Sequence, residues 1–318
     1  MELNSRIFVA GHRGLVGSAI VRELQRLGYQ NLILQTRAQT DLLSREAVDR
    51  LFQSEQPEYV FLAAAKVGGI LANSRYPADF LRDNLAIELN VIDSAWRHGV
   101  TKLEFLGSSC IYPKLAPQPL KEEYLLTGPL ETTNEWYAIA KIAGIKLCQA
   151  YRAQHNFDAI SAMPTNLYGP GDNFDLQNSH VLPALIRKFH EAHSEGRPEV
   201  TIWGTGTPRR EFLHVDDLAA AAVFLMLNYS EPEIVNVGVG DDVTIADLAK
   251  TVSKIVGYQG SIVFDTTKPD GTPRKLMDVS RLHAMGWRHR TGLEAGIRST
   301  YEWFKANPAI SSLTHSTV

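Results

Sequence analysis

The first two thirds of the chain alternate short apolar runs, rich in β-branched and aromatic residues, with longer segments of helical period. This alternation is typical of β-α-β units whose parallel strands are buried on both faces. It predicts strands over residues 6–10, 31–36, 59–65, 102–108 and 159–163. It predicts helices over residues 15–28, 44–54, 78–98 and 134–155, each long enough for a right-handed crossover. We therefore predict an α/β fold with a doubly wound parallel sheet.

The pattern becomes less regular after residue 170 and predicts a smaller α+β lobe. The expected helices span 180–195, 216–228, 244–257 and 293–306, and the expected strands span 200–203, 234–237 and 261–264. Two arrangements stay open for residues 216–240, which either belong to the lobe or return to the main sheet. Residues 113–133 are rich in Pro and Gly and predict a long loop over the carboxyl edge of the sheet, where ligands bind in such folds.

These elements divide the chain into two expected units. Residues 1–170, completed by 216–240, form the larger unit, and residues 171–215 with 241–306 form the smaller lobe. Residues 307–318 have no apolar period, so we expect a loose tail.

The composition of the 318 residues, with 44% hydrophobic and 21% charged side chains, is that of an ordinary folded protein. A net charge of −3 gives no general attraction for nucleic acid or for a membrane surface. Only Cys110 and Cys148 are present, without zinc-site spacing, so we expect neither a disulfide framework nor a metal site. Because there is no signal-peptide pattern and no apolar run of about 18 residues, we expect a cytoplasmic protein.

Three glycines, Gly11, Gly14 and Gly17, lie between the first predicted strand and the first predicted helix. Missing Cβ atoms permit a tight turn, close approach of the backbone to a pyrophosphate and close packing of helix on strand. This context predicts a Rossmann-type dinucleotide site. No acidic residue lies between Glu23 and Asp41, where a site for NAD would place one on the ribose 2′-hydroxyl.

Two arginines stand where a 2′-phosphate would bind. Arg37 follows the second predicted strand, and Arg13 lies inside the glycine turn. Guanidinium groups bind phosphates through two parallel hydrogen bonds, so this pair predicts NADP(H) as the cofactor. The alternative is that both arginines are solvated surface charges.

A candidate catalytic pair lies on the helix predicted over 134–155. Tyr137 and Lys141 are four residues apart and therefore share a helix face. A nearby ammonium group favours the phenolate, so we expect Lys141 to lower the pKa of Tyr137. The alternative is an amphipathic helix with a surface lysine. Ser108, at the end of the fourth predicted strand, adds a hydroxyl group at the carboxyl edge of the sheet.

Together the glycine turn, Ser108, Tyr137 and Lys141 resemble the extended short-chain dehydrogenase/reductase family. Residues 164–170, Pro-Thr-Asn-Leu-Tyr-Gly-Pro, are similar to the sugar-nucleotide signature of that family. The resemblance covers about residues 1–305. It narrows to a branch acting on GDP-linked 4-keto sugars in four further stretches, residues 63–70, 107–114, 178–180 and 268–275.

The resemblance implies epimerisation of a GDP-4-keto-6-deoxy sugar at C3 and C5, followed by reduction at C4 with NADPH. A C4 ketone acidifies the protons on both neighbouring carbons, so the site needs a base, an acid and donors for the enolate oxygen. By resemblance Cys110 is the base, His180 is the acid, and Ser108 and Tyr137 bind the oxygen. Tyr137 then protonates that oxygen. A thiolate at Cys110 requires a nearby cation to lower the pKa of its thiol.

The resemblance also implies which residues meet the cofactor and the substrate. The expected cofactor contacts are Gly11, His12, Arg13, Gly14, Leu15, Val16, Gly17, Arg37, Asp41, Leu42, Leu106, Gly107, Ser109, Lys141, Pro164, Asn166, Leu167 and His180. The expected substrate contacts are Lys188, Trp203, Arg210 and Asp270. Arg209 is interpreted as solvated, and Cys148 as a packing residue.

Two other functions stay open at this point. One is a 4-epimerase or 4,6-dehydratase with retained NAD, against which Arg37 and Cys110 both argue. The other is a non-catalytic module that senses NADP(H), against which the complete set of Ser108, Tyr137 and Lys141 argues. The resemblance implies a homodimer built on the helices over 78–98 and 134–155. Their apolar residues Leu81, Leu85, Leu89 and Ile92 are compatible with either a subunit interface or packing on the sheet.

Overall fold

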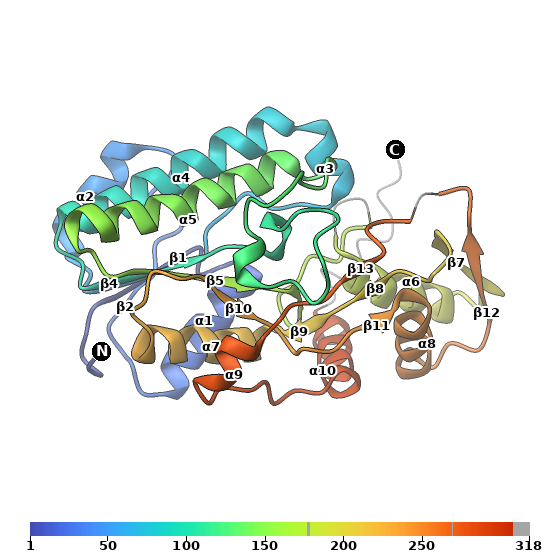
Figure 1. The fold of residues 1–318 in the computed structure, drawn as a ribbon. Coiled ribbons are helices and arrows are strands. Elements are labelled where there is room, and N and C mark those ends of the chain that lie inside the picture. The colour runs from blue at the N-terminus through green and yellow to red at the C-terminus, as the bar shows by residue number, and fades with distance from the viewer. Residues whose placement is uncertain (177–178, 269, 308–318) are drawn as a thin grey trace.

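A six-stranded, all-parallel sheet forms the centre of the larger unit (Figure 1). The structure is a computed structural model that describes residues 1–176, 179–268 and 270–307. The strand order is β10-β5-β4-β3-β1-β2. The strands are β1 (Ile7–Ala10), β2 (Leu32–Ile33), β3 (Tyr59–Leu62), β4 (Lys102–Leu106), β5 (Ala159–Pro164) and β10 (Val235–Val237). The predicted doubly wound fold is confirmed, and its direction of winding reverses between β1 and β3, beside which ligands of such sheets bind.

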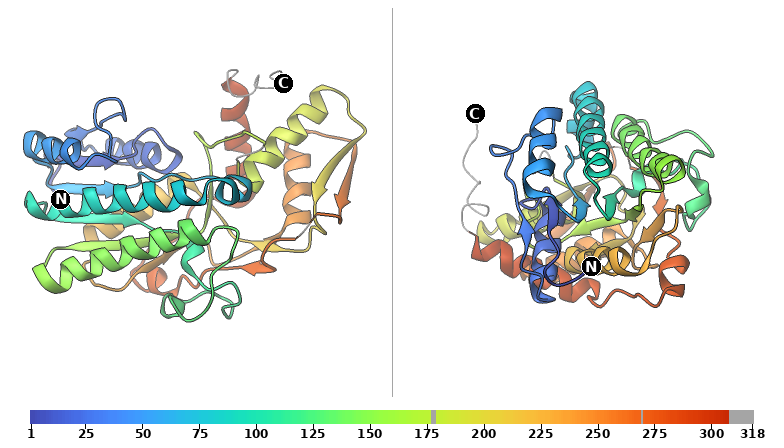
Figure 2. Two further views of the ribbon diagram at one scale, coloured as in Figure 1. Left: turned by 90° about the horizontal axis from the view of Figure 1, so that it is seen from above. Right: turned by 90° about the vertical axis from the view of Figure 1, so that its left-hand side faces the viewer.

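Helices cover both faces of this sheet (Figures 1 and 2). The upper face in Figure 1 carries α2 (Arg45–Glu55), α4 (Pro77–Arg97) and α5 (Glu135–His155), and the lower face carries α1 (Leu15–Arg26) and α7 (Val215–Asn228). On β4, Leu103 and Phe105 join the apolar core on one face, and Leu106 joins the core on the other. Burial on both faces explains why the strands read as continuous apolar runs.

The smaller lobe is built around a separate apolar core that includes Phe189, Ile202 and Phe304. Around it pack α6 (Val181–Ser194), β7 (Glu199–Trp203), α8 (Ile245–Val256), β12 (Ser261–Asp265) and α10 (Leu293–Ala306). Strand β7 pairs in parallel with β12. A small sheet in the order β11-β8-β13 consists of β8 (Arg209–Arg210), β11 (Val243–Thr244) and β13 (Arg274–Lys275). A further parallel pair joins β6 (Asn166–Tyr168) to β9 (Phe212–His214).

Residues 216–240 return to the main sheet, which decides between the two arrangements left open by the sequence. Val235–Val237 pair with residues 162–164 of β5, and α7 packs beside α1. The segment predicted as a strand over 31–36 forms only two paired residues at the sheet edge, because β2 has a neighbour on one side alone. Four short helical segments were not predicted: α3 (Ile70–Arg75), η1 (Ser109–Ile111), η2 (Glu122–Tyr124) and α9 (Ser280–Ala284).

The predicted loop over 113–133 contains one 3-10 turn, η2 (Glu122–Tyr124). Its Leu120 exchanges backbone hydrogen bonds with the segment that follows β13: the Leu120 amide donates to Leu276, and the Asp278 amide donates to Leu120. The loop therefore ties the sheet edge to the strand that carries Lys275.

Within the described ranges, no helix is long and apolar enough to cross a membrane. The same part of the chain contains no group of three His, Cys, Asp or Glu side chains that could hold a metal ion. The tail predicted to be loose lies outside the described residues except for Asn307, and so do Asn178 and Pro269 of the stretches named above.

Candidate active site

The glycine turn between β1 and α1 has no room for side chains. Gly11 has φ +84°, and a Cβ atom there would lie 2.8 Å from the backbone of Ala64. A Cβ atom on Gly17 would lie 2.1 Å from the carbonyl oxygen of Gly11. The N-cap of α1 is Gly14, and no side chain caps the free amides of the first turn. The turn thus combines close backbone access with uncapped donors, which fits the pyrophosphate of a dinucleotide.

The two arginines expected at a 2′-phosphate are both exposed. The side chain of Arg37 is 78% exposed and forms a long ion pair, 3.7 Å, with Asp41. Since a pair of this length and exposure holds a guanidinium weakly, Arg37 is available to a ligand.

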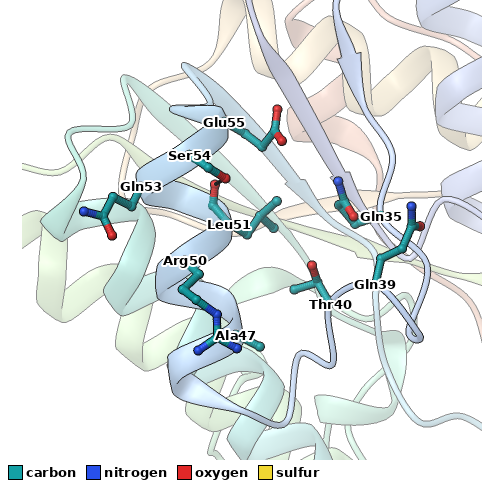
Figure 3. A pocket seen from close by; sticks show the side chains of 9 residues that line it. All are labelled: Gln35, Gln39, Thr40, Ala47, Arg50, Leu51, Gln53, Ser54 and Glu55. Carbon is teal, nitrogen blue, oxygen red and sulfur yellow. Dashed lines mark hydrogen bonds between the residues drawn. The ribbon is translucent and has the colours of Figure 1, made fainter.

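An open pocket of about 450 Å³ lies beside the same loop (Figure 3). Gln35, Gln39 and Thr40 from the segment after β2 face Arg50 and other side chains of α2 across it. None of the expected catalytic or binding residues lines this pocket. This pocket is therefore not the candidate active site, which lies at the carboxyl edge of the sheet.

The other expected cofactor residues lie where strands end. Leu106 ends β4, Pro164 ends β5, and Asn166 and Leu167 lie on β6. The Asn166 side chain donates to the backbone carbonyl of Glu211 at 2.8 Å. These positions belong to neighbouring strands, so the structure brings them to one edge of the molecule.

The hydroxyl and thiol groups follow β4 directly. Ser108 caps η1, and its Oγ accepts a hydrogen bond from the Cys110 amide at 3.3 Å. A Cβ atom on Gly107 would lie 2.4 Å from the Met163 side chain, so a larger residue there would require the end of that side chain to shift. Cys110 is buried, 7% exposed, and Ser109 is also buried. The turn thus presents Ser108 and Cys110 from a rigid strand end.

Helix α5 is attached to the same strand end through Lys141. Its Nζ donates to the Leu106 carbonyl at 3.0 Å and lies 4.5 Å from the centre of the Phe105 ring. The same Nζ lies 5.9 Å from the centre of the Tyr137 ring, on the preceding helical turn. The structure therefore brings Tyr137, Lys141 and the Ser108 turn together, as expected.

The predicted direction of the Tyr137 pKa is wrong. Burial raises the pKa of Tyr137 well above its usual value, and the neighbouring Cys110 and Glu88 raise it further. Lys141 forms a 3.3 Å ion pair with Glu88, and both side chains are only 2% exposed. Because the ammonium already has an anionic partner, it does not favour the phenolate as a free lysine would. The sequence analysis overlooked Glu88.

Opposing influences act on the proton affinity of Cys110. Burial raises the pKa of Cys110, while Lys275, the Ser108 hydroxyl and Lys141 act in the opposite direction. Lys275 on β13 is half-buried and is the nearby cation that the sequence analysis required but did not identify. In the sequence, Lys275 stands out only as the last residue of a Pro-rich and Gly-rich stretch, residues 268–275.

His180 is the N-cap of α6 and keeps an accessible surface. The surrounding protein nevertheless displaces enough water to lower the pKa of His180, and Lys275 lowers it further. Lys275 therefore acts electrostatically on both the expected base and the expected acid.

The expected substrate residues gather on the lobe. The indole of Trp203 is 58% exposed, and Lys188 Nζ lies 6.0 Å from its ring. Asp270 accepts hydrogen bonds from the amide and hydroxyl of Thr205 at 2.9 and 2.7 Å. Strand pairing sets Arg210 beside Lys275, and both lie within electrostatic reach of each other. The lobe thus presents an open aromatic surface together with cations.

Arg209 is not merely solvated, as interpreted from sequence: its side chain is 42% exposed but also ion-paired. It forms a 2.6 Å ion pair with Asp242, whose other oxygen binds Arg274 at 2.5 Å. The Asp242 side chain is 1% exposed, so this pair of arginines is structural and joins β8 to β13. Arg210 projects differently and makes a hydrogen bond only to the Arg209 carbonyl among the contacts resolved in the described residues.

Buried Glu211 fixes the position of these small strands. Its carboxylate accepts hydrogen bonds from the amides of Val239, Gly240 and Met277, at 2.5, 2.7 and 2.9 Å. Because Met277 lies two residues after Lys275, this carboxylate sets where β13 meets the end of the main sheet. A fully buried carboxylate is tolerated when backbone donors satisfy it.

Comparison with known proteins agrees with this geometry. Residues 7–238 match the model of the NAD dependent epimerase/dehydratase family. The chain is 63% identical to GDP-L-fucose synthase 1 of Arabidopsis thaliana, over 96% of this chain and 95% of that protein. It is 58% identical to the GDP-L-fucose synthase of Escherichia coli (strain K12), over 95% of this chain and 97% of that protein.

A solved structure shares the complete architecture. The GDP-L-fucose synthetase of Naegleria fowleri bound to NADP superposes with a TM-score of 0.90 at 29% identity, over 97% of this chain and 96% of that one. On the match of residues 7–238, and on relatives that are similar over nearly the whole length, the chain belongs to the NAD dependent epimerase/dehydratase family.

Proposed function

We propose that this chain converts GDP-4-keto-6-deoxy-D-mannose to GDP-L-fucose with NADPH, as a GDP-L-fucose synthase. The observation that carries the proposal is the position of Cys110, a buried thiol beside Ser108 and Tyr137 that shares the cation Lys275 with His180. A reductase without epimerisation needs no such base. The names and the identity of the relatives support the same substrate and cofactor.

In the proposed epimerisation, Ser108 and Tyr137 hold the C4 oxygen by hydrogen bonds. Cys110, as its thiolate, takes a proton from C3 or C5 and becomes the thiol, and the electrons of the broken C–H bond move to the C4 oxygen as an enolate. His180 returns a proton to the opposite face of the same carbon. Donors aimed at an oxygen that gains charge stabilise the transition state more than the ground state. The negative charge of the nucleotide sugar favours the protonated form of His180.

The reduction uses the same oxygen and the same donors. NADPH, when bound at the glycine turn and Arg37, supplies the hydride to C4. Tyr137 gives its phenolic proton to the C4 oxygen, which completes the alcohol. Lys141 holds the end of β4 through the Leu106 carbonyl and so fixes the distance between Ser108 and Tyr137.

The division of labour between the two units forms part of the proposal. Residues 1–170 with 216–240 bind NADP(H), and residues 171–215 with 241–306 bind the GDP-sugar through Lys188, Trp203, Arg210 and Asp270. Their exposed or half-buried surfaces support a role in ligand recognition. We also propose a cytoplasmic location, because the chain has only two cysteines, Cys110 and Cys148, without the spacing of a disulfide framework.

We further propose a homodimer through α4 and α5. Ile92 is fully buried against the sheet, whereas Leu85 and Leu89 on α4 are 37% and 52% exposed. Trp136 and Ile139 on the neighbouring α5 are also exposed. Large apolar side chains gathered on two adjacent helices favour a subunit interface.

The proposed function is tested by incubating purified protein with GDP-4-keto-6-deoxy-D-mannose and either NADPH or NADH. We expect ketosugar-dependent loss of nicotinamide absorbance with NADPH and a product identified by NMR as GDP-L-fucose. Binding of NADPH without turnover of this ketosugar would overturn the substrate assignment.

A further inference from the structure

Glu88 is a buried carboxylate that the proposed mechanism does not yet use. It lies in the middle of α4 with 2% of its surface exposed, and Lys141 Nζ is 3.3 Å from its Oε1. Among the described residues, neither carboxylate oxygen has another hydrogen-bond partner. A buried carboxylate with a single cationic partner is costly to maintain, so its position calls for a reason.

The space around Glu88 is closed. A Cβ atom on Gly144 would lie 2.8 Å from Glu88 Oε2 and 2.5 Å from the Phe105 ring. Glycine at this position on α5 therefore lets α4 approach closely enough for the carboxylate to reach Lys141. The titratable groups that face Glu88 are Lys141, Tyr137 and Cys148, all on α5.

The reduction step makes a specific demand on Tyr137. The C4 oxygen gains a proton while C4 gains a hydride, so Tyr137 must carry its proton when the hydride arrives. An ammonium group facing the phenol alone would favour the phenolate and leave no proton to give. A carboxylate beside the same ammonium opposes the phenolate, and Glu88 indeed raises the pKa of Tyr137.

We propose that Glu88 is a positioning residue for reduction: its carboxylate, held against Lys141, balances the ammonium charge and keeps Tyr137 in its proton-donating form. The proposal rests on the proposed function, since it concerns the reductive half of that reaction. In this step the O–H bond of Tyr137 breaks, the O–H bond at C4 forms, and solvent later returns a proton to the phenolate. Glu88 itself forms and breaks no bond.

The test is the pH dependence of reduction in the Glu88→Gln variant. Burial raises the pKa of Glu88 to about 7, so the group is ionised on the alkaline side, where Tyr137 loses its proton. Removing this charge makes the phenolate easier to form. We expect the alkaline limb of NADPH oxidation to move about one pH unit lower. Deuterium exchange at C3 and C5 uses the Tyr137 hydroxyl only as one of two donors to the C4 oxygen, beside Ser108, so we expect its alkaline limb to move less than that of reduction.

Asp93→Asn is the matched control. Asp93 lies on the same helix and pairs with Arg97 at 2.8 Å, and it has no resolved interaction with Tyr137 or Lys141. We expect its alkaline limb to coincide with that of the wild type. A Glu88→Gln profile that also coincides with the wild type would overturn the proposal, and so would equal displacement of the reduction and exchange profiles.

A second variant guards against failure of Glu88→Gln to fold. Glu88→Asp keeps the charge and draws it away from Lys141, so we expect a smaller displacement in the same direction together with a lower kcat. Ultraviolet difference titration without cofactor, with Tyr137→Phe as reference, reads the ionisation of Tyr137 directly. Onset at lower pH in the Glu88 variant supports the proposal, and unchanged onset contradicts it. Failure of the wild type to turn over the ketosugar would instead contradict the proposed function.

Discussion

The two sides of the candidate site differ in how deeply their residues are buried. Cys110, Lys141 and Glu88 are buried behind the end of β4 and between two helices of 21 residues each. On the lobe, Trp203 is 58% exposed, and Arg210 lies on a strand of two residues. Burial sets the proton affinities of the first group, whereas accessibility leaves the second free to bind charge and an aromatic base. In the proposed function, the buried side transfers protons and the exposed side binds the substrate.

We expect the largest effect from replacing Cys110, the proposed general base on the buried side of the site. Cys110→Ala should reduce deuterium exchange at C3 and C5 about 10³-fold, because general base catalysis is worth that much. NADPH affinity should stay unchanged, since Cys110 does not belong to the expected cofactor contacts. Mass spectrometry of the ketosugar in deuterated water measures the exchange. Exchange at the wild-type rate would identify another residue as the base.

Breaking the recognition side should change binding and leave chemistry intact. Arg210→Ala should raise KM for the GDP-sugar about 10²-fold with little change in kcat, since a charge-assisted contact present in ground and transition states affects binding alone. Arg209→Ala is the matched control, because Arg209 is bound to Asp242. Steady-state kinetics of both variants decide the point. Equal effects at both positions would contradict the assignment.

Lys275 lies on the lobe but acts on the buried Cys110. Replacing it therefore tests whether the lobe contributes to proton transfer. Lys275 lowers the pKa of Cys110 against the effect of burial, and its removal should let that pKa rise. Because the thiolate is the base, exchange in Lys275→Met should require a pH about one unit higher, a loss of about tenfold at neutral pH. Lys268→Met is the control, since Lys268 lies over Trp203 at 5.8 Å. A pH profile of exchange that is displaced in Lys268→Met but not in Lys275→Met would contradict this role.

The smallest effect is expected at the exposed cofactor arginine. Arg37→Ala should weaken NADPH about fivefold and leave NADH unchanged, since an exposed ion pair contributes at most about 1 kcal/mol. Fluorescence titration with the two cofactors measures both affinities. Equal weakening would show that Arg37 does not contact a 2′-phosphate.

Long periodic elements were predictable from sequence because their patterns repeat several times. The helices α4 and α5 begin and end within about one residue of prediction. Strands β8 and β13 have two residues each and no period to detect. Lys275 was therefore overlooked, since pairing with β8 is what places it near Cys110.

Charge environment was the other property that sequence did not reveal. Glu88 is an ordinary helix residue in the sequence, and only packing shows that it is buried against Lys141. The raised pKa of Tyr137 follows from burial, which no spacing of Tyr and Lys encodes. The positions of Ser108 after β4 and of Tyr137 and Lys141 on α5 were predictable, but the balance of charges around them was not.

The central claim is that a single site epimerises and then reduces the ketosugar. The most direct measurement is NMR of the product formed with NADPH in deuterated water. We predict GDP-L-fucose with deuterium at C3 and C5 and protium at C4, since the first two protons come from solvent and the hydride comes from the cofactor. A C4-reduced product with protium at C3 and C5 would contradict the account.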